Sequence, residues 1–335
     1  MNFVTGGTGL LGAHLLHHLI TKGEKVRALK RENSSLKTVE DIFEFYQSKN
    51  LFPQIEWVNG DVLDILSLEV GMQGCDYVYH CAATVSFAKK DKEQMFKINI
   101  EGTANLVNTA LKLNIKKFCH VSSTAALGES VENGKITEEK LWVDKKDKSN
   151  YAFSKKFSEM EVWRGIEEGL NAVIVNPSVI IGPGNEEKSS ASLFNKVKEG
   201  LKYYTHGINA FVDARDVAEI MVKLMHSDIH SERFLVIGEN ISFKELFNSI
   251  AENLKLPAPK REAKRWMAEI IWRVEGARSF IFGSTPLITK ENAQSAYRKA
   301  YYSNKKVKSA LGFEFIPIQK SIEDAAGFYK NQLNN

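Results

Sequence analysis

The sequence predicts an α/β fold in which a doubly wound parallel sheet is followed by a smaller, mostly helical C-terminal lobe. The first observation is that apolar, strand-like runs alternate with stretches of helical periodicity. These runs lie at residues 25–29, 55–58, 77–81, 118–121 and 172–175. Such alternation is typical of a parallel sheet with helices on both faces. The second observation is a glycine-punctuated turn at the very start of the chain.

This turn reads Thr5-Gly-Gly-Thr-Gly-Leu-Leu-Gly12 and lies between apolar Phe3-Val4 and an amphipathic stretch. Glycines allow a tight turn and a close approach of the backbone to a ligand, and a helix N-terminus offers unpaired N–H groups to an anion. We therefore predict a Rossmann-type strand, phosphate loop and helix that bind a dinucleotide. The glycines are spaced Gly-x-x-Gly-x-x-Gly, and a purely structural turn is the alternative. The expected cofactor contacts are Gly6, Thr8, Gly9, Leu10, Leu11 and Gly12.

Composition narrows the class of protein. The chain has 335 residues, 43% of them apolar, so it can bury a sizeable core. The net charge of +4 is a small difference between 45 basic and 41 acidic residues, which does not indicate a nucleic-acid partner. Cys75, Cys81 and Cys119 lack metal-ligand spacing and are expected as buried thiols in a reducing compartment. We expect a cytoplasmic protein, because no apolar run reaches membrane-spanning length and the first strand leaves no room for a signal peptide.

After Pro177 the pattern becomes irregular, with helices predicted at residues 214–225, 243–254 and 321–329. We expect residues 1–176 to form the dinucleotide-binding domain. Residues 177–335 would form a substrate-binding lobe, from which some strands and helices return to the first domain. Ser242 and Glu245 predict a capping box. Asp216 is expected to begin or cap the helix at 214–225.

The end of the second strand indicates which dinucleotide is bound. A carboxylate there would hold an unmodified ribose, whereas this chain has Lys30 and Arg31, which suit a 2′-phosphate. Glu32 follows directly, and the two cations could also simply be solvated. We therefore favour NADP(H) and keep NAD(H) open.

The ends of the next two strands also suit a cofactor. Asp61 and Val62 follow the third strand, where a carboxylate could accept from an adenine amino group, although a helix cap is the alternative. Cys81, Ala82 and Ala83 end the fourth strand, and their small side chains would let a cofactor lie against the backbone.

Tyr151 and Lys155 lie four residues apart and so share one helix face. A nearby ammonium stabilises a phenolate, which makes this pair a candidate acid–base unit. The pairs Tyr301/Lys305 and Tyr302/Lys306 have the same spacing, but we expect them to be structural because they lie near the end of the chain. Only the first pair follows the fifth strand and its Ser122-Ser123 by a single loop.

With these motifs the chain resembles the extended short-chain dehydrogenases/reductases, in the broad family of NAD-dependent epimerases and dehydratases, over nearly its whole length. The resemblance implies a catalytic triad of Ser123, Tyr151 and Lys155, the serine being counted back from Gly128. It also implies that Ser122 lies beside the cofactor. The matching positions of the family's remaining cofactor contacts are Gly6, Gly9, Gly12, Asp61, Cys81, Ala82, Ala83, Asn99, Pro177 and Val179.

Within the family the chain is most similar to dihydroflavonol-reductase-like proteins and to the hopanoid-associated sugar-epimerase-like group. Sugar-nucleotide dehydratases carry Asp-Glu after the catalytic hydroxyl residue, whereas Ala125 and Ala126 follow Thr124 here. The resemblance implies NADP(H)-dependent reduction of a ketone or aldehyde, with hydride transfer and proton donation by Tyr151. A carbonyl compound, an alcohol or a sugar would be the substrate, and a homodimer is the default by analogy. An epimerase that uses bound NAD and a non-catalytic NADP(H)-binding or sensing protein remain the alternatives.

The substrate is expected to contact Thr84, Ser86, Phe87, Thr124 and Asn185. His14, His17 and His18 crowd the first helix, where we expect packing or solvent exposure and no metal. The apolar segment at residues 266–282 is expected to pack in the core of the second lobe. A substrate lid or a dimer contact is its main alternative, and a membrane-surface helix a weaker one.

Overall fold

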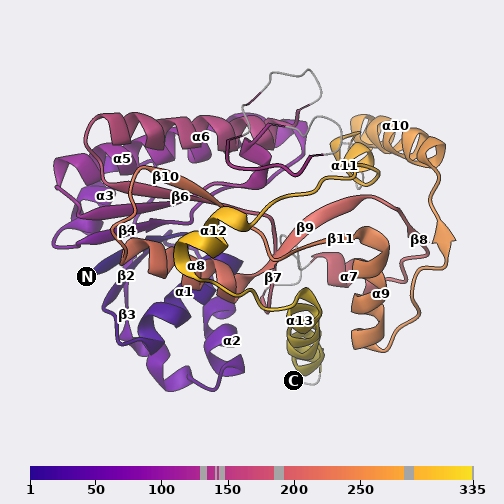
Figure 1. The fold of residues 1–335 in the computed structure, drawn as a ribbon, viewed down its shortest axis with the longest axis horizontal. Coiled ribbons are helices and arrows are strands. Elements are labelled where there is room, and N and C mark those ends of the chain that lie inside the picture. Colours follow the sequence, from indigo (N-terminus) through magenta and orange to yellow (C-terminus); the bar gives the residue numbers. More distant parts are fainter. Residues whose placement is uncertain (129–133, 140–141, 143–147, 185–191, 283–289, 334–335) are drawn as a thin grey trace.

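The computed structural model describes residues 1–128, 134–139, 142, 148–184, 192–282 and 290–333. Within them the chain folds around a seven-stranded sheet in which every neighbouring pair is parallel, in the order β10-β6-β5-β4-β1-β2-β3 (Figure 1). The predicted doubly wound α/β fold is therefore confirmed. The strands are β1 (Asn2–Thr5), β2 (Val26–Lys30), β3 (Ile55–Asn59), β4 (Tyr77–His80), β5 (Lys117–Val121), β6 (Ala172–Pro177), β7 (Val179–Ile181), β8 (Tyr203–Tyr204), β9 (Ile208–Asp213), β10 (Glu232–Val236), β11 (Glu239–Ser242) and β12 (Arg261–Glu262).

Helices cover both faces of this sheet (Figure 1). The α-helices are α1 (Leu10–Thr21), α2 (Lys37–Phe45), α3 (Ile65–Met72), α4 (Lys92–Phe96), α5 (Gly102–Lys112), α6 (Asn150–Glu167), α7 (Ser192–Lys198), α8 (Ala214–Met225), α9 (Phe243–Leu254), α10 (Arg265–Phe282), α11 (Lys290–Ser295), α12 (Lys305–Leu311) and α13 (Ile318–Leu333). Short helical turns complete the list: η1 (Lys49–Gln54), η2 (Lys89–Asp91), η3 (Lys97–Glu101) and η4 (Thr124–Ala126).

The strands alternate their side chains between two apolar cores, as the period of two in a strand requires. Val4 points into the core that α1, α2 and α8 cover. Phe3 points into the opposite core, which α3, α5 and α6 cover. Because both faces of the sheet are buried, the strands appear in the sequence as continuous apolar runs. The five predicted strands correspond to β2 to β6, and their ends differ from the prediction by two residues at most.

The C-terminal half returns to this sheet. Strand β10 pairs with β6 at the sheet edge, and α8 packs against α1. The rest of the C-terminal half forms a lobe in which β11, β9 and β7 make a small sheet, while α9, α13 and α7 share an apolar core beside it (Figure 1). This small sheet joins short strands that are distant in sequence, which is why the residue pattern did not indicate it.

Helix starts in this lobe only partly follow the prediction. The capping box is confirmed at α9, where the Ser242 hydroxyl accepts from the Glu245 N–H and the Glu245 carboxylate accepts from the Ser242 N–H. At α8 the prediction was wrong, because Asp213 is the N-cap and accepts from the Arg215 N–H at 2.8 Å. Asp216 lies in the first turn of α8, where its carboxylate accepts from the Ile316 N–H at 2.9 Å.

The first half of α10 is not core, contrary to the prediction for the apolar segment at residues 266–282, and the side chains at 280–282 lie outside the described residues. Trp266, Ile270 and Val274 are 61%, 54% and 59% exposed. The reason is that α10 lies at the outer end of the lobe, where α11 is its main neighbour (Figure 1). None of the described helices is both long and apolar enough to cross a membrane.

Candidate active site

A large cavity follows the carboxyl ends of the central strands and continues into the C-terminal lobe. Its volume is about 2610 Å³, which exceeds the roughly 300–1,000 Å³ of a pocket for one small ligand. Side chains after β1 to β6 all contribute to it, and this is the edge at which open parallel sheets bind ligands. The cavity therefore has room for two ligands placed end to end.

The glycine turn closes one end of the cavity. Gly6 has φ +71°, and a Cβ there would lie 2.5 Å from the backbone nitrogen of Ala82. A Cβ on Gly12 would lie 2.1 Å from the carbonyl oxygen of Gly6. Gly9 is the N-cap of α1 and brings no capping side chain, so the first amides of the helix face the cavity rather than a cap. A helix start built in this way is an anion site.

The two cations at the end of β2, its last residue Lys30 and the following Arg31, lie in different surroundings. Arg31 lines the cavity, whereas Lys30 does not, because its Nζ donates to Asn59 Oδ1 on β3 at 2.8 Å. The sequence reasoning missed the polar segment that follows Arg31. It also lines the cavity, through Asn33, Ser34, Ser35, Lys37 and Thr38. Its signal was the density of small polar residues directly after a basic strand end.

Five of the predicted residues lie at the next two strand ends, and three of them line the cavity. Asp61 lines the cavity, and its Oδ1 also accepts from the Leu63 N–H at 2.9 Å. Val62 packs in the core beneath, against Gly102. Cys81 and Ala83 line the cavity. The remaining residue of that strand end, Ala82, lies against Gly6 and packs on the core.

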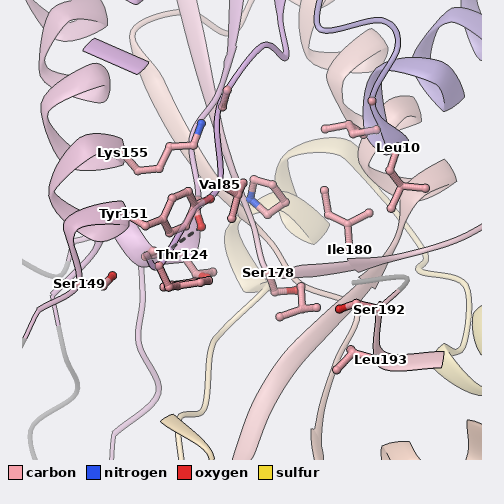
Figure 2. Close-up of a pocket in the computed structure, with 18 of the residues that line it drawn as sticks. Leu10, Val85, Thr124, Ser149, Tyr151, Lys155, Ser178, Ile180, Ser192 and Leu193 are labelled. Atoms are coloured by element: carbon pink, nitrogen blue, oxygen red, sulfur yellow. Dashed lines mark hydrogen bonds between the residues drawn. The ribbon is translucent and has the colours of Figure 1, made fainter. Parts of the chain in front are cut away.

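Ser123, Tyr151 and Lys155 converge on the middle of the cavity. Helix α6 begins at the Ser149 cap, whose hydroxyl accepts from the Ala152 N–H at 3.1 Å, so Tyr151 lies in the first turn. Tyr151 and Lys155 project from one face of α6 into the cavity, across from Leu10 and Ile180 (Figure 2). Ser123 follows β5 in extended backbone and hydrogen-bonds the Tyr151 hydroxyl.

The surroundings of the triad shift two pKa values. Shielding from water raises the pKa of Tyr151, and the hydrogen bond with Ser123 acts in the opposite direction. Burial lowers the pKa of Lys155 to about 8, while Cys81 and Glu159 oppose that shift. Lys155 is 4% exposed, and its Nζ donates to the Val121 carbonyl at 2.8 Å. This arrangement gives a tyrosine that keeps its proton, with an ammonium one helical turn away.

Comparison with known proteins identifies the family of this chain. A family model described as the NAD-dependent epimerase/dehydratase family matches residues 2–238. The chain belongs to this family. It is an NAD(P)-dependent enzyme of the extended short-chain dehydrogenase/reductase type.

Individual relatives cover nearly the whole chain. A putative dihydroflavonol 4-reductase from Synechocystis sp. is 29% identical over 336 residues, covering 98% of this chain and 94% of that protein. Sterol demethylase protein B from Methylococcus capsulatus is 29% identical over 259 residues, covering 77% and 75%. The crystal structure of gox2253 is 27% identical, covers 99% of this chain and 98% of its own, and superposes with a TM-score of 0.82.

In this member of the epimerase/dehydratase family a buried carboxylate supports the triad, and the sequence analysis missed it. Glu159 lies four residues after Lys155 and is fully buried. Its Oε2 accepts from Ser122 Oγ at 2.7 Å and from Asn176 Nδ2 at 2.9 Å. Its Oε1 pairs with Arg233 Nη1 at 3.0 Å. Asn176 Nδ2 also donates to the Ser123 carbonyl at 3.0 Å, so the network connects α6, β6, β10 and the segment after β5 around Ser123.

Asn99, predicted as a cofactor contact, does not line the cavity. It is 2% exposed, and its side chain holds the backbone of Thr84 from both sides, at 2.7 Å and 2.9 Å. Its Nδ2 also donates to Ser154 Oγ on α6 at 2.9 Å. Asn99 therefore fixes the loop after β4 to the helix that carries the triad.

Some of the residues predicted to contact the substrate line the cavity, and others do not. Thr124 and Phe87 line the cavity, and the Phe87 ring lies edge-on to Tyr151 with centroids 5.9 Å apart. Thr84 and Ser86 do not line it, and Ser86 Oγ donates to Asp91 Oδ2 at 2.7 Å. Asn185 lies outside the described residues. Pro177, Val179 and Ser122, predicted on the cofactor side, all line the cavity.

The far half of the cavity is mostly apolar and was not predicted residue by residue. No local pattern in the sequence marks these residues, because they come from α7, β8, β9, α9, α10 and the chain after α7 and α11, which meet only in the folded lobe. The apolar and aromatic lining residues there are Leu193, Leu201, Tyr203, Tyr204, Phe211, Phe243, Phe247, Met267, Ala268, Ile271 and Tyr297.

The contacts of the three histidines in α1 agree with the prediction that these side chains pack against neighbours or face solvent. His14 is 2% exposed, and its Nε2 lies 2.9 Å from the Pro183 carbonyl. His17 Nε2 lies 3.0 Å from Ser48 Oγ, and its ring packs on Tyr46. His18 is half-buried. Among the residues that the structure describes, no group of three or more His, Cys, Asp or Glu side chains is placed to hold a metal ion.

The two later Tyr/Lys pairs lie apart from the triad. Tyr301 is 42% exposed. Tyr302 lines the cavity, but Lys306 turns away to form an ion pair with Glu232 and to donate to the Arg233 carbonyl at 3.0 Å.

Proposed function

We propose that the protein is an NADPH-dependent reductase of a ketone or aldehyde. The observation that carries this proposal is the convergence of Ser123, Tyr151 and Lys155 on one cavity that also contains the phosphate loop. The putative dihydroflavonol 4-reductase among the relatives supports a reductase. The alanines at 125 and 126 leave no acid–base pair for the elimination of water at that position.

The residues present fit a dinucleotide with a 2′-phosphate. The uncapped first turn of α1 would hold the diphosphate, since it has no acidic side chain. Arg31 would pair with the 2′-phosphate, and Ser34 and Ser35 would donate to it from the same segment. Asp61 would accept from the adenine amino group. Cys81 and Ala83 leave the space beside the strand ends free of bulky side chains.

When bound, NADPH supplies the hydride. Tyr151 would donate its proton to the carbonyl oxygen of the substrate, and the shielding that raises its pKa keeps that proton in place until transfer. Ser123 would donate a hydrogen bond to the same oxygen and so orient the carbonyl. Lys155 holds a positive charge close to Tyr151 and stabilises the phenolate that remains. Val121 accepts one of its protons, which leaves two for the ribose hydroxyls and the proton relay.

Calorimetric titration with NADPH and NADH tests the cofactor assignment. We expect the wild-type protein to bind NADPH on the order of tenfold more tightly, which is about 1.4 kcal/mol. Arg31→Ala should lose this preference, whereas Lys30→Ala should keep it because Lys30 contacts Asn59 instead of the cavity. Tighter binding of NADH by the wild-type protein would contradict the assignment, as would an equal effect of the two variants.

A second candidate is an epimerase that retains NAD through oxidation and re-reduction of a sugar. The observation that favours it is that Asn195, Lys196 and Arg298 line the cavity, where they could contact the diphosphate of a nucleotide sugar. Purified protein that carries tightly bound NAD would support the epimerase. Stoichiometric NADPH oxidation with a carbonyl compound would support the reductase, and NADPH binding without turnover of any carbonyl or sugar would support a sensing protein. The homodimer and the cytoplasmic location stay predictions.

A further inference from the structure

Helix α10 presents an apolar ridge to solvent. Trp266, Ile270 and Val274 are spaced four residues apart, so they lie along one face of the helix, and each is more than half exposed. Isolated exposed apolar residues are ordinary, but three on one helix face form a contiguous surface. We call these three residues the α10 ridge.

The neighbouring face of the same helix contributes to the substrate half of the cavity. Met267, Ala268 and Ile271 line the cavity from α10. Tyr297 anchors the start of the helix, because its hydroxyl donates to the Ala263 carbonyl at 2.8 Å. Figure 1 shows α10 at the outer end of the C-terminal lobe, away from the seven-stranded sheet. The helix therefore contributes both to the wall of the cavity and to the exposed ridge.

A basic cluster lies directly beside the ridge. Lys260, Arg261, Lys264 and Arg265 are all exposed and occupy β12, the chain on either side of it and the first residue of α10. The single acid among them, Glu262, lies 3.7 Å from His206 Nε2. The surface thus combines an exposed tryptophan and two aliphatic side chains with four cations, while the acids on the helix itself, Glu269 and Glu275, pair with Arg273 and Arg278.

We propose that the α10 ridge and this basic cluster dock the protein on an anionic lipid surface. Tryptophan favours the boundary between headgroups and acyl chains, aliphatic side chains insert below it, and lysines and arginines stay among the anionic headgroups. A second copy of the chain fits the charges less well. A two-fold interface would bring the same four cations toward each other, and like charges across an interface are unfavourable.

Docking in this way places the substrate half of the cavity one helix away from the lipid. The apolar cavity lining and the apolar ridge then lie on adjacent faces of one helix, so a carbonyl compound dissolved in the membrane would have a short apolar route to the cavity. Surface docking needs no turnover. The proposal consequently does not depend on the proposed function, and the two can fail separately.

Sedimentation with vesicles tests the proposal, using the full-length protein and vesicles either of phosphatidylcholine alone or of phosphatidylcholine with phosphatidylglycerol. We expect binding to the mixed vesicles that is weakened by salt, and on the order of tenfold weaker binding to phosphatidylcholine alone. Trp266→Ser/Ile270→Ser/Val274→Ser should lower binding to the mixed vesicles by on the order of tenfold or more. Replacing the four basic residues with glutamine should lower it similarly and remove the salt dependence.

Helix α3 offers a matched control. Leu66 and Val70 are also four residues apart and are 73% and 74% exposed, but their neighbours are Asp64 and Glu69. Leu66→Ser/Val70→Ser should leave vesicle binding unchanged. Circular dichroism of each variant checks that the fold is intact.

Three outcomes would overturn the proposal. They are wild-type protein that fails to sediment with the mixed vesicles, equal binding to both compositions, and equal losses in the α3 and α10 variants. Sedimentation velocity without lipid adds a further check. A dimer that dissociates in the α10 ridge variant would show that a second copy covers the ridge, and an acidic protein partner that competes with the vesicles for wild-type protein alone would show a protein interface instead.

Discussion

At the scale of single residues, the least expected feature is the buried ion pair between Glu159 and Arg233. Removing two charges from water costs several kcal/mol for each ion, so such a pair contributes little net stability by itself. It does give the site a fixed geometry, because Ser122 and Asn176 donate to the same carboxylate and Asn176 also holds the Ser123 backbone. Glu159 is thus a positioning residue for the triad.

Glu159→Gln should destabilise the protein by about 3 kcal/mol, because Arg233 would be left without its buried counter-charge. It should also lower kcat while NADPH binding stays within about twofold, since its hydrogen bonds reach Ser122 and Asn176 rather than the phosphate loop. Urea unfolding and steady-state kinetics measure the two effects. Glu161→Gln is the control. It breaks a partly exposed pair with Arg164, three residues along the helix, and should cost less than about 1 kcal/mol. Equal losses in both variants would contradict this account.

Tyr151→Phe removes only the hydroxyl that we assign as the proton donor. General acid catalysis of this kind contributes roughly 10²–10⁴-fold, so kcat for carbonyl reduction should fall by about that factor, with the NADPH dissociation constant nearly unchanged. Stopped-flow or steady-state NADPH oxidation provides the measurement. Tyr301→Phe at an exposed pair of the same spacing should behave as wild type. Wild-type turnover in Tyr151→Phe would remove Tyr151 from the mechanism.

The contrast between Lys30 and Arg31 shows what could be learned about the site from the sequence. The presence of two cations at the end of β2 could be predicted from the spacing to the glycine loop. Which of the two faces the cavity could not be predicted, because Lys30 is held by Asn59, 29 residues further along the chain. Glu159 was missed for the same reason, since its partners on β5, β6 and β10 become neighbours only when the sheet forms.

At the scale of elements, the phosphate loop depends on the absence of side chains. A Cβ on Gly12 would lie 2.1 Å from the Gly6 carbonyl oxygen, a backbone atom that can move only if the whole loop moves. We therefore expect Gly12→Ala to abolish NADPH binding in calorimetry and to lower the melting temperature. Gly327→Ala is the matched control, because that glycine lies within α13 with nothing within 4 Å of the added Cβ. It should stabilise the helix by roughly 0.5–1 kcal/mol and leave binding intact. Tight NADPH binding by Gly12→Ala would contradict the assignment of this loop.

Elements defined by local periodicity were predictable, and those defined by distant pairing were not. Helices α8 and α9 begin and end at the predicted residues, because their apolar faces repeat every three to four positions. Strand β7 has three residues and pairs with β9, some thirty positions later, so no local pattern marks it. The exposure of α10 was unpredictable for a related reason. Its periodicity indicates a helix but does not reveal which neighbours the helix will have.

At the scale of the whole molecule, the two halves of the chain are interlocked around α8. This helix follows β9 of the small sheet, yet it packs against α1 of the phosphate loop. Arg215 near its start pairs with Asp213 and with Asp324 of α13. Asp216 in its first turn holds the Ile316 N–H just before α13. A change in the charge of Asp216 therefore acts on the junction between the sheet and the lobe.

Asp216 should make stability depend on pH. It is 2% exposed, and burial together with the nearby Asp213 raises its pKa to about 7, against about 3.9 in an unfolded chain. Between these values the folded protein keeps a proton that the unfolded chain has released. Protonated Asp216 therefore makes its full contribution to the free energy of unfolding below about pH 4. This contribution falls by up to about 1.4 kcal/mol per pH unit as the pH rises to 7.

Asp216→Asn should remove this dependence, because the amide oxygen can still accept from Ile316 without carrying a titrating charge. Between pH 5 and pH 7 the free energy of unfolding of the wild-type protein should fall by about 2 kcal/mol relative to that of the variant. Urea titrations at several pH values measure the difference. Glu44→Gln breaks an exposed pair with Lys49 and should run parallel to wild type over this range. Parallel curves for Asp216→Asn and the wild type would mean that the carboxylate is already ionised at pH 5, so that the junction between the halves carries a charge throughout.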